Sequence, residues 1–302
     1  MLPAVLSRCC PNYCFTYPLK STLRPLVRSR YIRLVEPFAG SAAVTLAAAS
    51  QQKFHSYIIG DALEPLIRIW QIVIDDPTTV AEHYEILWHR EREKPIHAYY
   101  EIRSEFNADR NSAKLLYLLA RCVKNAVRFN SVGEFNQSPG KRRKGTHPQT
   151  MKAELFAAHR VLAGNCKAVH TDFVPLFLSA QEGDFFYLDP PYQGTSQGRD
   201  QRYIAGVSRD QMINALMILN EKGIPFILSY DGSCGERNYG EPLPEAVAHR
   251  ILLDVGRSSQ ATLNSRDDVT IESLYLSHAI PSSRKGTTLS LEDFSAQASL
   301  FA

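Results

Sequence analysis

The 302-residue sequence lacks long apolar runs, and this absence excludes a membrane-spanning helix. No window approaches the roughly 18 uninterrupted apolar residues that a spanning helix needs. The opening segment, Met1 to Leu6, is too short for a secretory signal and is interrupted by a proline. With 44% hydrophobic and 22% charged residues, the composition is that of an ordinary globular protein with one large domain or two modest ones. We therefore expect a cytoplasmic protein without a membrane partner.

Cysteine is also scarce, with six residues in the whole chain. Cys9, Cys10 and Cys14 lie close together, but no second pair at zinc-finger spacing accompanies them. A scattered set of this kind is typical of reduced thiols in a reducing compartment. We expect neither a disulfide framework nor a bound metal.

Glycine is missing where a dinucleotide-binding protein needs it. A strand is predicted over residues 31–35, followed by the turn Glu36 to Ser41 and an alanine-rich helix over 42–49. The turn holds a single glycine, Gly40, and no G-x-G-x-x-G pattern. Close approach of a pyrophosphate to the backbone requires those glycines. A nicotinamide oxidoreductase is therefore disfavoured.

A second strand, predicted over residues 57–61, ends in Asp61. In βαβ nucleotide-binding units, an acid at the end of the second strand binds the ribose hydroxyls. The combination of a ribose-binding acid with a glycine-poor turn favours a nucleoside ligand without phosphates. It points to S-adenosylmethionine.

The α/β alternation is interrupted between residues 78 and 150. Helical patterns run from 78 to about 127, and a stretch rich in glycine, asparagine and cations follows, including the four consecutive cations from Lys141 to Lys144. Such a run is either a solvated loop or a phosphate-binding segment, and the net charge of the chain is only +3. We read 78–150 as an inserted, mainly helical domain with a basic loop.

The alternation resumes after the insertion. Helices are predicted over 63–74, before the insertion, and over 151–162, 174–180 and 208–222 after it. Ser208 is the expected cap of the last helix and Gly223 its stop. Strands are predicted over 167–170, 185–188, 225–230, 250–255 and 272–277. The last two strands are expected to pair as an antiparallel edge. This predicts an α/β fold with a Rossmann-like sheet, built from residues 15–77 and 151–280, and a loose C-terminal tail over 281–302.

The strand over 185–188 stops abruptly at Asp189-Pro190-Pro191-Tyr192. Neither proline can donate to a sheet, and each holds the preceding residue extended. A carboxylate, a carbonyl and an aromatic ring are thereby placed on a stiff turn at the edge where open α/β sheets bind ligands. A rigid acceptor pair beside a ring suits the exocyclic amine of a nucleobase. Taken alone, a simple strand-to-loop turn with an acidic cap is equally compatible.

Four motifs together resemble the DNA adenine methylase (Dam) family: Glu36 to Ser41, Gly60-Asp61, Arg128 to Asn136, and Asp189 to Tyr192. They occur in family order, and the resemblance runs from about residue 15 to 280. It implies a Rossmann-like methyltransferase domain with an inserted target-recognition domain. It also implies methyl transfer from S-adenosylmethionine to adenine N6 of a base flipped out of duplex DNA.

The resemblance and the basic run together assign the candidate site residues. The expected catalytic residues are Asp189, Pro190 and Tyr192. The expected cofactor-binding residues are Tyr17, Lys20, Glu36, Pro37, Phe38, Gly40, Asp61, Asp172, Phe173 and Asp189. The expected DNA-binding residues are Arg128, Asn130, Lys141, Arg142, Arg143 and Lys144. A monomer is expected, and a cognate restriction endonuclease acting on the same sequence is a candidate partner.

Three alternative functions stay open from the sequence. A cytosine-N4 or an RNA methyltransferase would use the same acceptor geometry on a different amine. A catalytically inactive DNA-binding homologue is the third, because Tyr17 to Lys20 lacks the two glycines that family members carry there. A cytosine-C5 enzyme is disfavoured because it needs a thiol nucleophile, typically after proline, and the chain has no Pro-Cys pair.

Overall fold

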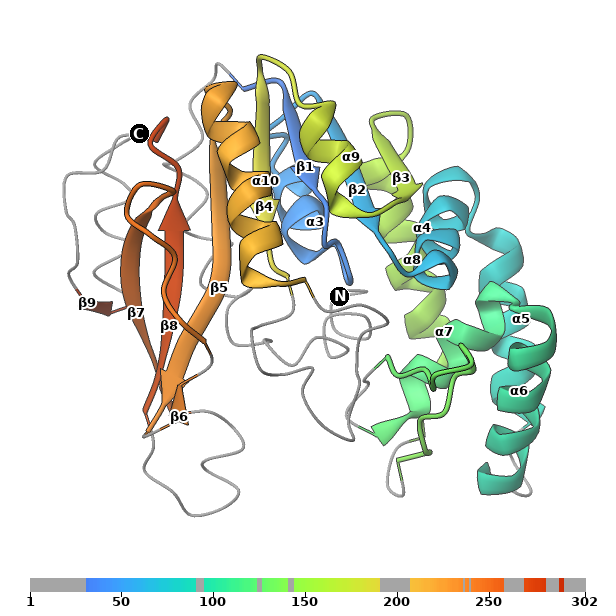
Figure 1. Ribbon diagram of the computed structural model, residues 1–302. Coiled ribbons are helices and arrows are strands. Elements are labelled where there is room, and N and C mark those ends of the chain that lie inside the picture. The colour runs from blue at the N-terminus through green and yellow to red at the C-terminus, as the bar shows by residue number, and fades with distance from the viewer. Residues whose placement is uncertain are drawn as a thin grey trace.

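The computed structural model describes most of the chain from residue 31 onward. The described residues are 31–90, 95–123, 127–140, 144–190, 207–235, 237–238, 240–257, 269–280 and 288–290. They form a central sheet with helices on both faces and a group of helices beyond one end of the sheet (Figure 1).

The sheet has nine strands: β1 (Arg33–Glu36), β2 (Ser56–Asp61), β3 (Cys166–His170), β4 (Asp184–Leu188), β5 (Phe226–Cys234), β6 (Arg237–Asn238), β7 (His249–Arg257), β8 (Val269–Leu276) and β9 (Thr288–Ser290). Their order is β3-β2-β1-β4-β5-β8-β7-β9, with β6 paired to β5. Pairing is parallel from β3 through β5, whereas β8 runs antiparallel to both β5 and β7. The order reverses between β1 and β4, which makes this junction the topological switch point. The predicted α/β, Rossmann-like class is confirmed.

The helices of the described chain are α3 (Ala43–Ser50), α4 (Glu64–Asp75), α5 (Thr78–Arg90), α6 (Pro95–Asp109), α7 (Ser112–Arg121), α8 (Pro148–Leu162), α9 (Phe173–Leu178) and α10 (Arg209–Glu221). Helices α9 and α10 cover one face of the sheet, and α3, α4 and α8 cover the other (Figure 1). Both faces are therefore buried, and every residue of the central strand β4 is buried with them. None of the helices described is long and apolar enough to cross a membrane.

Local signals in the sequence set several of the element ends. Ser208 caps α10 in a capping box with Gln211, as the sequence predicts. Gly223, at φ +66°, ends that helix in the left-handed region that favours glycine. Helix α8 begins at Pro148, three residues before the predicted start, because proline is favoured in the first turn of a helix.

The inserted helices α5, α6 and α7 lie beyond the β3 end of the sheet (Figure 1). Tyr84, Tyr99 and Phe106 are fully buried in a core that continues into the α3, α4 and α8 layer. The insertion therefore packs directly on the sheet's helical layer, and the domain boundaries at 78 and 150 stay a prediction.

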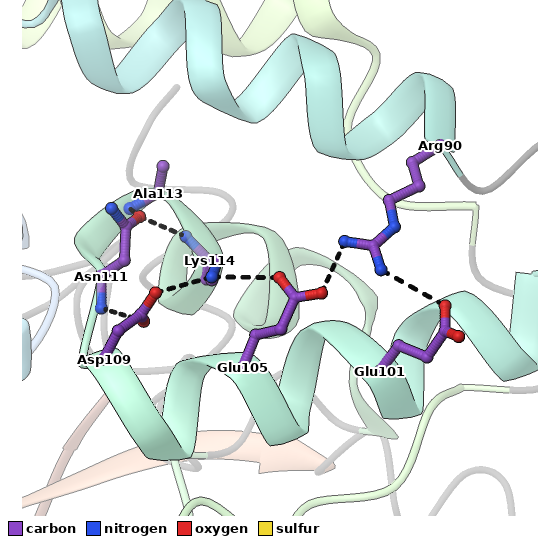
Figure 2. A network of polar contacts seen from close by, with 7 residues as sticks. All are labelled: Arg90, Glu101, Glu105, Asp109, Asn111, Ala113 and Lys114. Carbon is purple, nitrogen blue, oxygen red and sulfur yellow. Dashed lines mark hydrogen bonds and ion pairs between the residues drawn. The ribbon is translucent and has the colours of Figure 1, made fainter.

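A chain of polar contacts joins the three inserted helices (Figure 2). Arg90 of α5 donates to Glu101 and Glu105 of α6, and Lys114 of α7 donates to Asp109 and contacts Glu105. The side chain of Asn111 caps α7 by accepting from the backbone N–H groups of Ala113 and Lys114. The ion pairs are largely exposed, so each contributes little, whereas the cap satisfies two otherwise unpaired donors.

The C-terminal part of the sheet departs from the expectation in two respects. The predicted antiparallel pair of late strands is present, but β8 starts at Val269, three residues early. The pair is not the edge of the sheet, because β9 (Thr288–Ser290) pairs in parallel with residues 252–254 of β7. These three residues belong to the segment expected to be a loose tail, and backbone hydrogen bonds to an open strand edge order them.

Candidate active site

Two candidate residues that lie 153 positions apart in the sequence meet at the switch point. Glu36 is the last residue of β1, and Asp189 follows the last residue of β4. The two strands pair in parallel, with Leu34 opposite Phe185, so their carboxyl ends lie side by side. Burial, with a further contribution from the nearby charge of Asp189, raises the pKa of Glu36 to about 8. The fold thus brings the first and the last predicted motifs together.

Glu36 links the end of β1 to the start of α3. Its side chain is only 4% exposed, and Oε2 accepts hydrogen bonds from the hydroxyl of Thr45 and, at 2.9 Å, from the backbone N–H of Thr45. Accepting an N–H in the first turn of a helix satisfies a donor that has no partner within the helix. The residue is therefore a structural support of the turn that follows β1, whatever else it binds.

That turn has a strained backbone and is held from two sides. Gly40 and Ala42 both have φ +47°, which alanine rarely adopts. The N–H of Gly40 donates to Oδ2 of Asp61 at 3.0 Å, and its carbonyl accepts from the indole N–H of Trp70 at 3.0 Å. Strained turns held in this way are common where a backbone approaches a ligand.

Asp61, at the end of β2, is the residue that fixes this turn to the second strand. Its Oδ1 accepts from the N–H of Leu63 at 2.9 Å, while Oδ2 bonds Gly40. Burial raises the pKa of Asp61, and the two backbone hydrogen bonds oppose that rise. Each carboxylate oxygen carries two lone pairs, so acceptor positions remain for a hydroxyl group.

Aromatic rings stand beside the same edge of the sheet. The ring of Phe38, in the turn after β1, lies 5.1 Å from that of Phe173, the first residue of α9. Asp172 caps α9 by accepting from the N–H of Val174 at 3.0 Å, and its side chain is exposed. Predicted residues from the first motif and from the 172–173 pair are thus brought together. Pro37, between Glu36 and Phe38, is buried.

Not every candidate residue falls in the described part of the chain. Asp189 is half-buried and Pro190 is buried. Outside the described residues lie Tyr17, Lys20, Lys141, Arg142, Arg143 and Tyr192.

Glu272 is a further carboxyl group at this edge, and no sequence motif pointed to it. It lies on β8 opposite Gly232 of β5 and Leu253 of β7, and its side chain is 6% exposed. Its Oε2 has no hydrogen-bond partner among the described residues. Burial, together with the charge of Asp189, raises its pKa to about 8. An acid within an apolar strand was the available signal, but the neighbour of that strand was not readable from sequence.

The segment expected to read DNA forms a small hairpin. Phe129 and Phe135 face each other in an antiparallel bridge, and both rings are buried. Oδ1 of Asn130 accepts from the N–H groups of Val132 and Glu134, and its Nδ2 donates to Glu134. The side chain of Asn130 therefore closes the turn. The tip residue, Val132, is 75% exposed.

Two other candidate DNA contacts lie among the described residues. Arg128 is half-buried, and its carbonyl accepts from the N–H of Asn136 across the hairpin. Lys144 is exposed, just before α8.

The described residues do not provide a ligand set of the kind that holds metal ions. No group of three or more His, Cys, Asp or Glu residues that could hold a metal ion occurs there.

Comparison with known proteins agrees with this geometry. The model of the D12 class of N6 adenine-specific DNA methyltransferases matches residues 17–258. The Retron Ec67 DNA adenine methylase of Escherichia coli is 29% identical over 206 residues, or 65% of this chain and 68% of that protein. The Type II methyltransferase M1.LlaDCHI of Lactococcus lactis subsp. cremoris is 26% identical over 265 residues, or 81% of this chain and 86% of that protein.

A solved structure of the rRNA methyltransferase aviRa from Streptomyces viridochromogenes aligns with a TM-score of 0.40 and 11% identity, over 90% of this chain and 86% of that one. The family match spans most of the sequence and includes both the turn after β1 and the Asp189 motif. The chain belongs to the D12 class of N6 adenine-specific DNA methyltransferases.

Proposed function

We propose that this enzyme methylates the N6 amine of an adenine extruded from duplex DNA, at the edge of the sheet where β1, β2 and β4 end. One observation carries the proposal: the turn after β1 joins Asp61 on one side and stands beside Asp189 on the other. A methyl donor held by the turn and Asp61 would therefore lie next to an amine held by Asp189.

Family membership implies S-adenosylmethionine as the methyl donor, which supplies a methyl group activated by a sulfonium. Asp61 would accept hydrogen bonds from the ribose hydroxyls through lone pairs that Gly40 and Leu63 leave open. The half-buried ring of Phe38, which packs against the buried ring of Phe173, would offer an apolar surface for the donor's adenine. Tyr17 and Lys20 stay predictions from the family motif.

Asp189 and Pro190 would act on the target amine. The lone pair of adenine N6 is delocalised into the ring, so the amine is a poor nucleophile. Two acceptors, the Asp189 carboxylate and the Pro190 carbonyl, would hold both N–H groups and favour a pyramidal nitrogen. The positive charge that grows on nitrogen would then be stabilised where it forms. Positioning of amine and methyl group would supply much of the remaining rate enhancement.

The amine of a paired adenine is inaccessible, so the base must leave the duplex. Tyr192 would stack on the extruded ring. The basic run ending at Lys144 would contact phosphates, and Arg128 is the candidate for a bidentate guanine contact. Asn130 would act through the shape of the hairpin, since its side chain already bonds Glu134 and Val132.

Incubation with tritiated S-adenosylmethionine and unmethylated duplex DNA tests the proposal, with nucleosides separated afterwards. We expect label in N6-methyladenine. Label in N4-methylcytosine, or transfer to RNA in preference to DNA, would support the neighbouring activities instead. DNA binding without any label would identify an inactive homologue.

A cognate restriction endonuclease is a further proposal, since the Lactococcus relative is named a Type II methyltransferase. Methylation of the genome at one short sequence, and cleavage of unmethylated DNA at the same sequence by a co-encoded nuclease, would support it. The monomeric state and the cytoplasmic location stay predictions.

A further inference from the structure

Glu272 is a buried acid that the proposed mechanism leaves unused. Its side chain is 6% exposed, and Oε2 has no hydrogen-bond partner among the described residues. Buried polar atoms are nearly always hydrogen-bonded, because an unpaired one loses its contacts with water and gains nothing in return. A buried carboxyl with one oxygen unpaired among the described residues, beside the candidate active site, therefore calls for a ligand.

The strand pairing places Glu272 at the same edge of the sheet as Asp189. Strand β8 runs antiparallel to β5, so a residue near the start of β8 lies near the carboxyl end of β5. Glu272 is opposite Gly232, four residues beyond Leu228, which in turn pairs with Leu188 of β4. Both acids thus lie at the carboxyl ends of the parallel strands.

The alternation of side chains places both acids on the same face of the sheet. Leu274, two residues after Glu272, belongs to the core that α3, α4 and α8 cover. Tyr187, two residues before Asp189, belongs to the same core. Residues two apart in an extended segment share a face, and Pro190 keeps Asp189 extended. The two side chains therefore project toward one region, as the influence of Asp189 on Glu272 also indicates.

The position of Glu272 is fixed closely by its neighbour. A Cβ atom on Gly232 would lie 2.4 Å from the carbonyl oxygen of Ile271 and 3.1 Å from Cα of Glu272. No side chain is tolerated at such distances, so glycine permits the start of β8 to seat directly on β5. The pairing of β5 with β8 also shifts register between Ser229 and Gly232. Irregularities of this kind bend a strand and change the direction of its side chains.

The surroundings of Glu272 favour the neutral form of its carboxyl. The charged group that raises its pKa to about 8, besides burial, is Asp189. Opposite it on β7 is the apolar Leu253. The neighbouring strand β5 also carries a buried acid, Asp231. It accepts hydrogen bonds from Arg250 and from the hydroxyl of Tyr275, whose ring lies in the core on the opposite face. No cation in the described chain therefore pairs with Glu272. A neutral carboxyl has an O–H to donate.

We propose that Glu272 binds the target adenine by donating a hydrogen bond from its neutral carboxyl to one of the ring nitrogens that flank the amino group, N1 or N7. This contact orients the base so that N6 faces Asp189 and Pro190. Ionisation of Glu272 removes the O–H donor and adds a second negative charge beside Asp189. The carboxylate and the ring nitrogen would then both be acceptors, so no hydrogen bond could form between them. The inference rests on the proposed function, because it takes adenine as the base held at Asp189.

Two variants of Glu272 test whether its side chain acts as a hydrogen-bond donor. Glu272→Gln keeps a donor and cannot ionise, so we expect kcat/KM within about threefold of wild type at pH 7. We also expect a smaller decline above pH 8 than in wild type, because Glu36 still titrates there whereas residue 272 does not. Glu272→Ala removes the donor, so we expect kcat/KM to fall by about tenfold or more. Wild type itself should lose activity as the pH rises through about 8. Circular dichroism and thermal melting establish that both variants fold.

A substrate change completes the test. 1-Deazaadenine lacks N1 and 7-deazaadenine lacks N7. Duplexes with either analogue at the target position are compared with the adenine duplex, and kcat/KM is measured for wild type and for Glu272→Ala. We expect one of the two analogues to slow wild type by about tenfold but to leave the Ala variant nearly unchanged, which is the coupling expected of a direct contact. The proposal is overturned if each analogue slows wild type and Glu272→Ala by the same factor. It is also overturned if kcat/KM of Glu272→Gln is as low as that of Glu272→Ala. If wild type instead formed no N6-methyladenine from the adenine duplex, the proposed function would have failed rather than the role of Glu272.

Discussion

The backbone N–H of Gly40 donates a hydrogen bond of 3.0 Å to Oδ2 of Asp61, which ties the turn after β1 to the end of β2. The same carboxylate accepts from the N–H of Leu63 at 2.9 Å. Asp61 shapes the turn that would receive the methyl donor. In the proposed function it would also offer acceptors for the ribose. Substitutions at this residue test the two roles together.

For Asp61→Ala, we expect the dissociation constant for S-adenosylmethionine to rise by about tenfold or more, because both roles are lost. Asp61→Asn keeps one carbonyl oxygen and should fall between wild type and the Ala variant. Isothermal titration calorimetry measures the affinities. Asp76→Ala is a matched control, because Asp76 also accepts from a backbone N–H, that of Thr78, but in the exposed turn before α5. Unchanged cofactor affinity in a folded Asp61→Ala protein would refute the assignment.

The free energy of unfolding should depend on pH through Glu36. Its pKa is about 8 in the folded protein against an ordinary value of 4.5, so the folded state binds the proton more tightly. The resulting stabilisation is complete below pH 4.5 and is lost as the pH rises through 8. Glu36→Gln keeps an acceptor for Thr45 and removes the ionisation, so its stability should fall less between pH 5.5 and 8.5. Urea unfolding at the two pH values measures this, and equal slopes for the two proteins would contradict the prediction.

Arg128 and Lys144 should affect DNA binding in different ways. Arg128→Ala keeps the backbone bond that holds the hairpin and should cost about 1–3 kcal/mol on the cognate sequence only, as expected for a base contact. Lys144→Ala should weaken binding equally on cognate and scrambled duplexes and should lower the slope of log K against log salt by about 0.9. Fluorescence anisotropy at several salt concentrations distinguishes the two. Equal losses on both duplexes for Arg128→Ala would make it another phosphate contact.

The inserted helices offer a test of which polar contacts matter for stability. Asn111→Ala removes the cap of α7 and should cost about 1 kcal/mol of unfolding free energy. Glu105→Ala breaks contacts to both Arg90 and Lys114, yet it should cost less than about 1 kcal/mol, because those pairs are largely exposed (Figure 2). Urea unfolding of both variants compares them. A larger loss for Glu105→Ala would mean that the network acts as a unit.

Much of the sheet was predictable because its strands end at strong local signals. The predicted strands over 57–61 and 185–188 match β2 and β4 within one residue, since an acid stops each apolar run. The confirmed cap at Ser208 and stop at Gly223 are also local, because each acts within one turn of its helix.

The contacts that the sequence analysis missed join residues far apart in the chain. The indole of Trp70 bonds the carbonyl of Gly40, 30 positions away, and Glu272 reaches the active-site edge only because β8 lies beside β5. No periodicity encodes which strand will neighbour another. Asn130 illustrates a different limit, because the same residue type serves both turn formation and base recognition, and its hydrogen bonds place it in the turn.

The most direct test of the account is the single-turnover rate of N6-methyladenine formation by Asp189→Ala, measured with saturating S-adenosylmethionine and duplex DNA. Glu182→Ala is the matched control, because that exposed acid precedes the opposite end of β4. We predict that Asp189→Ala lowers the rate by at least about 100-fold while DNA binding and folding persist, and that Glu182→Ala leaves it unchanged. A folded, DNA-bound Asp189→Ala enzyme that forms N6-methyladenine at the wild-type rate would contradict the account.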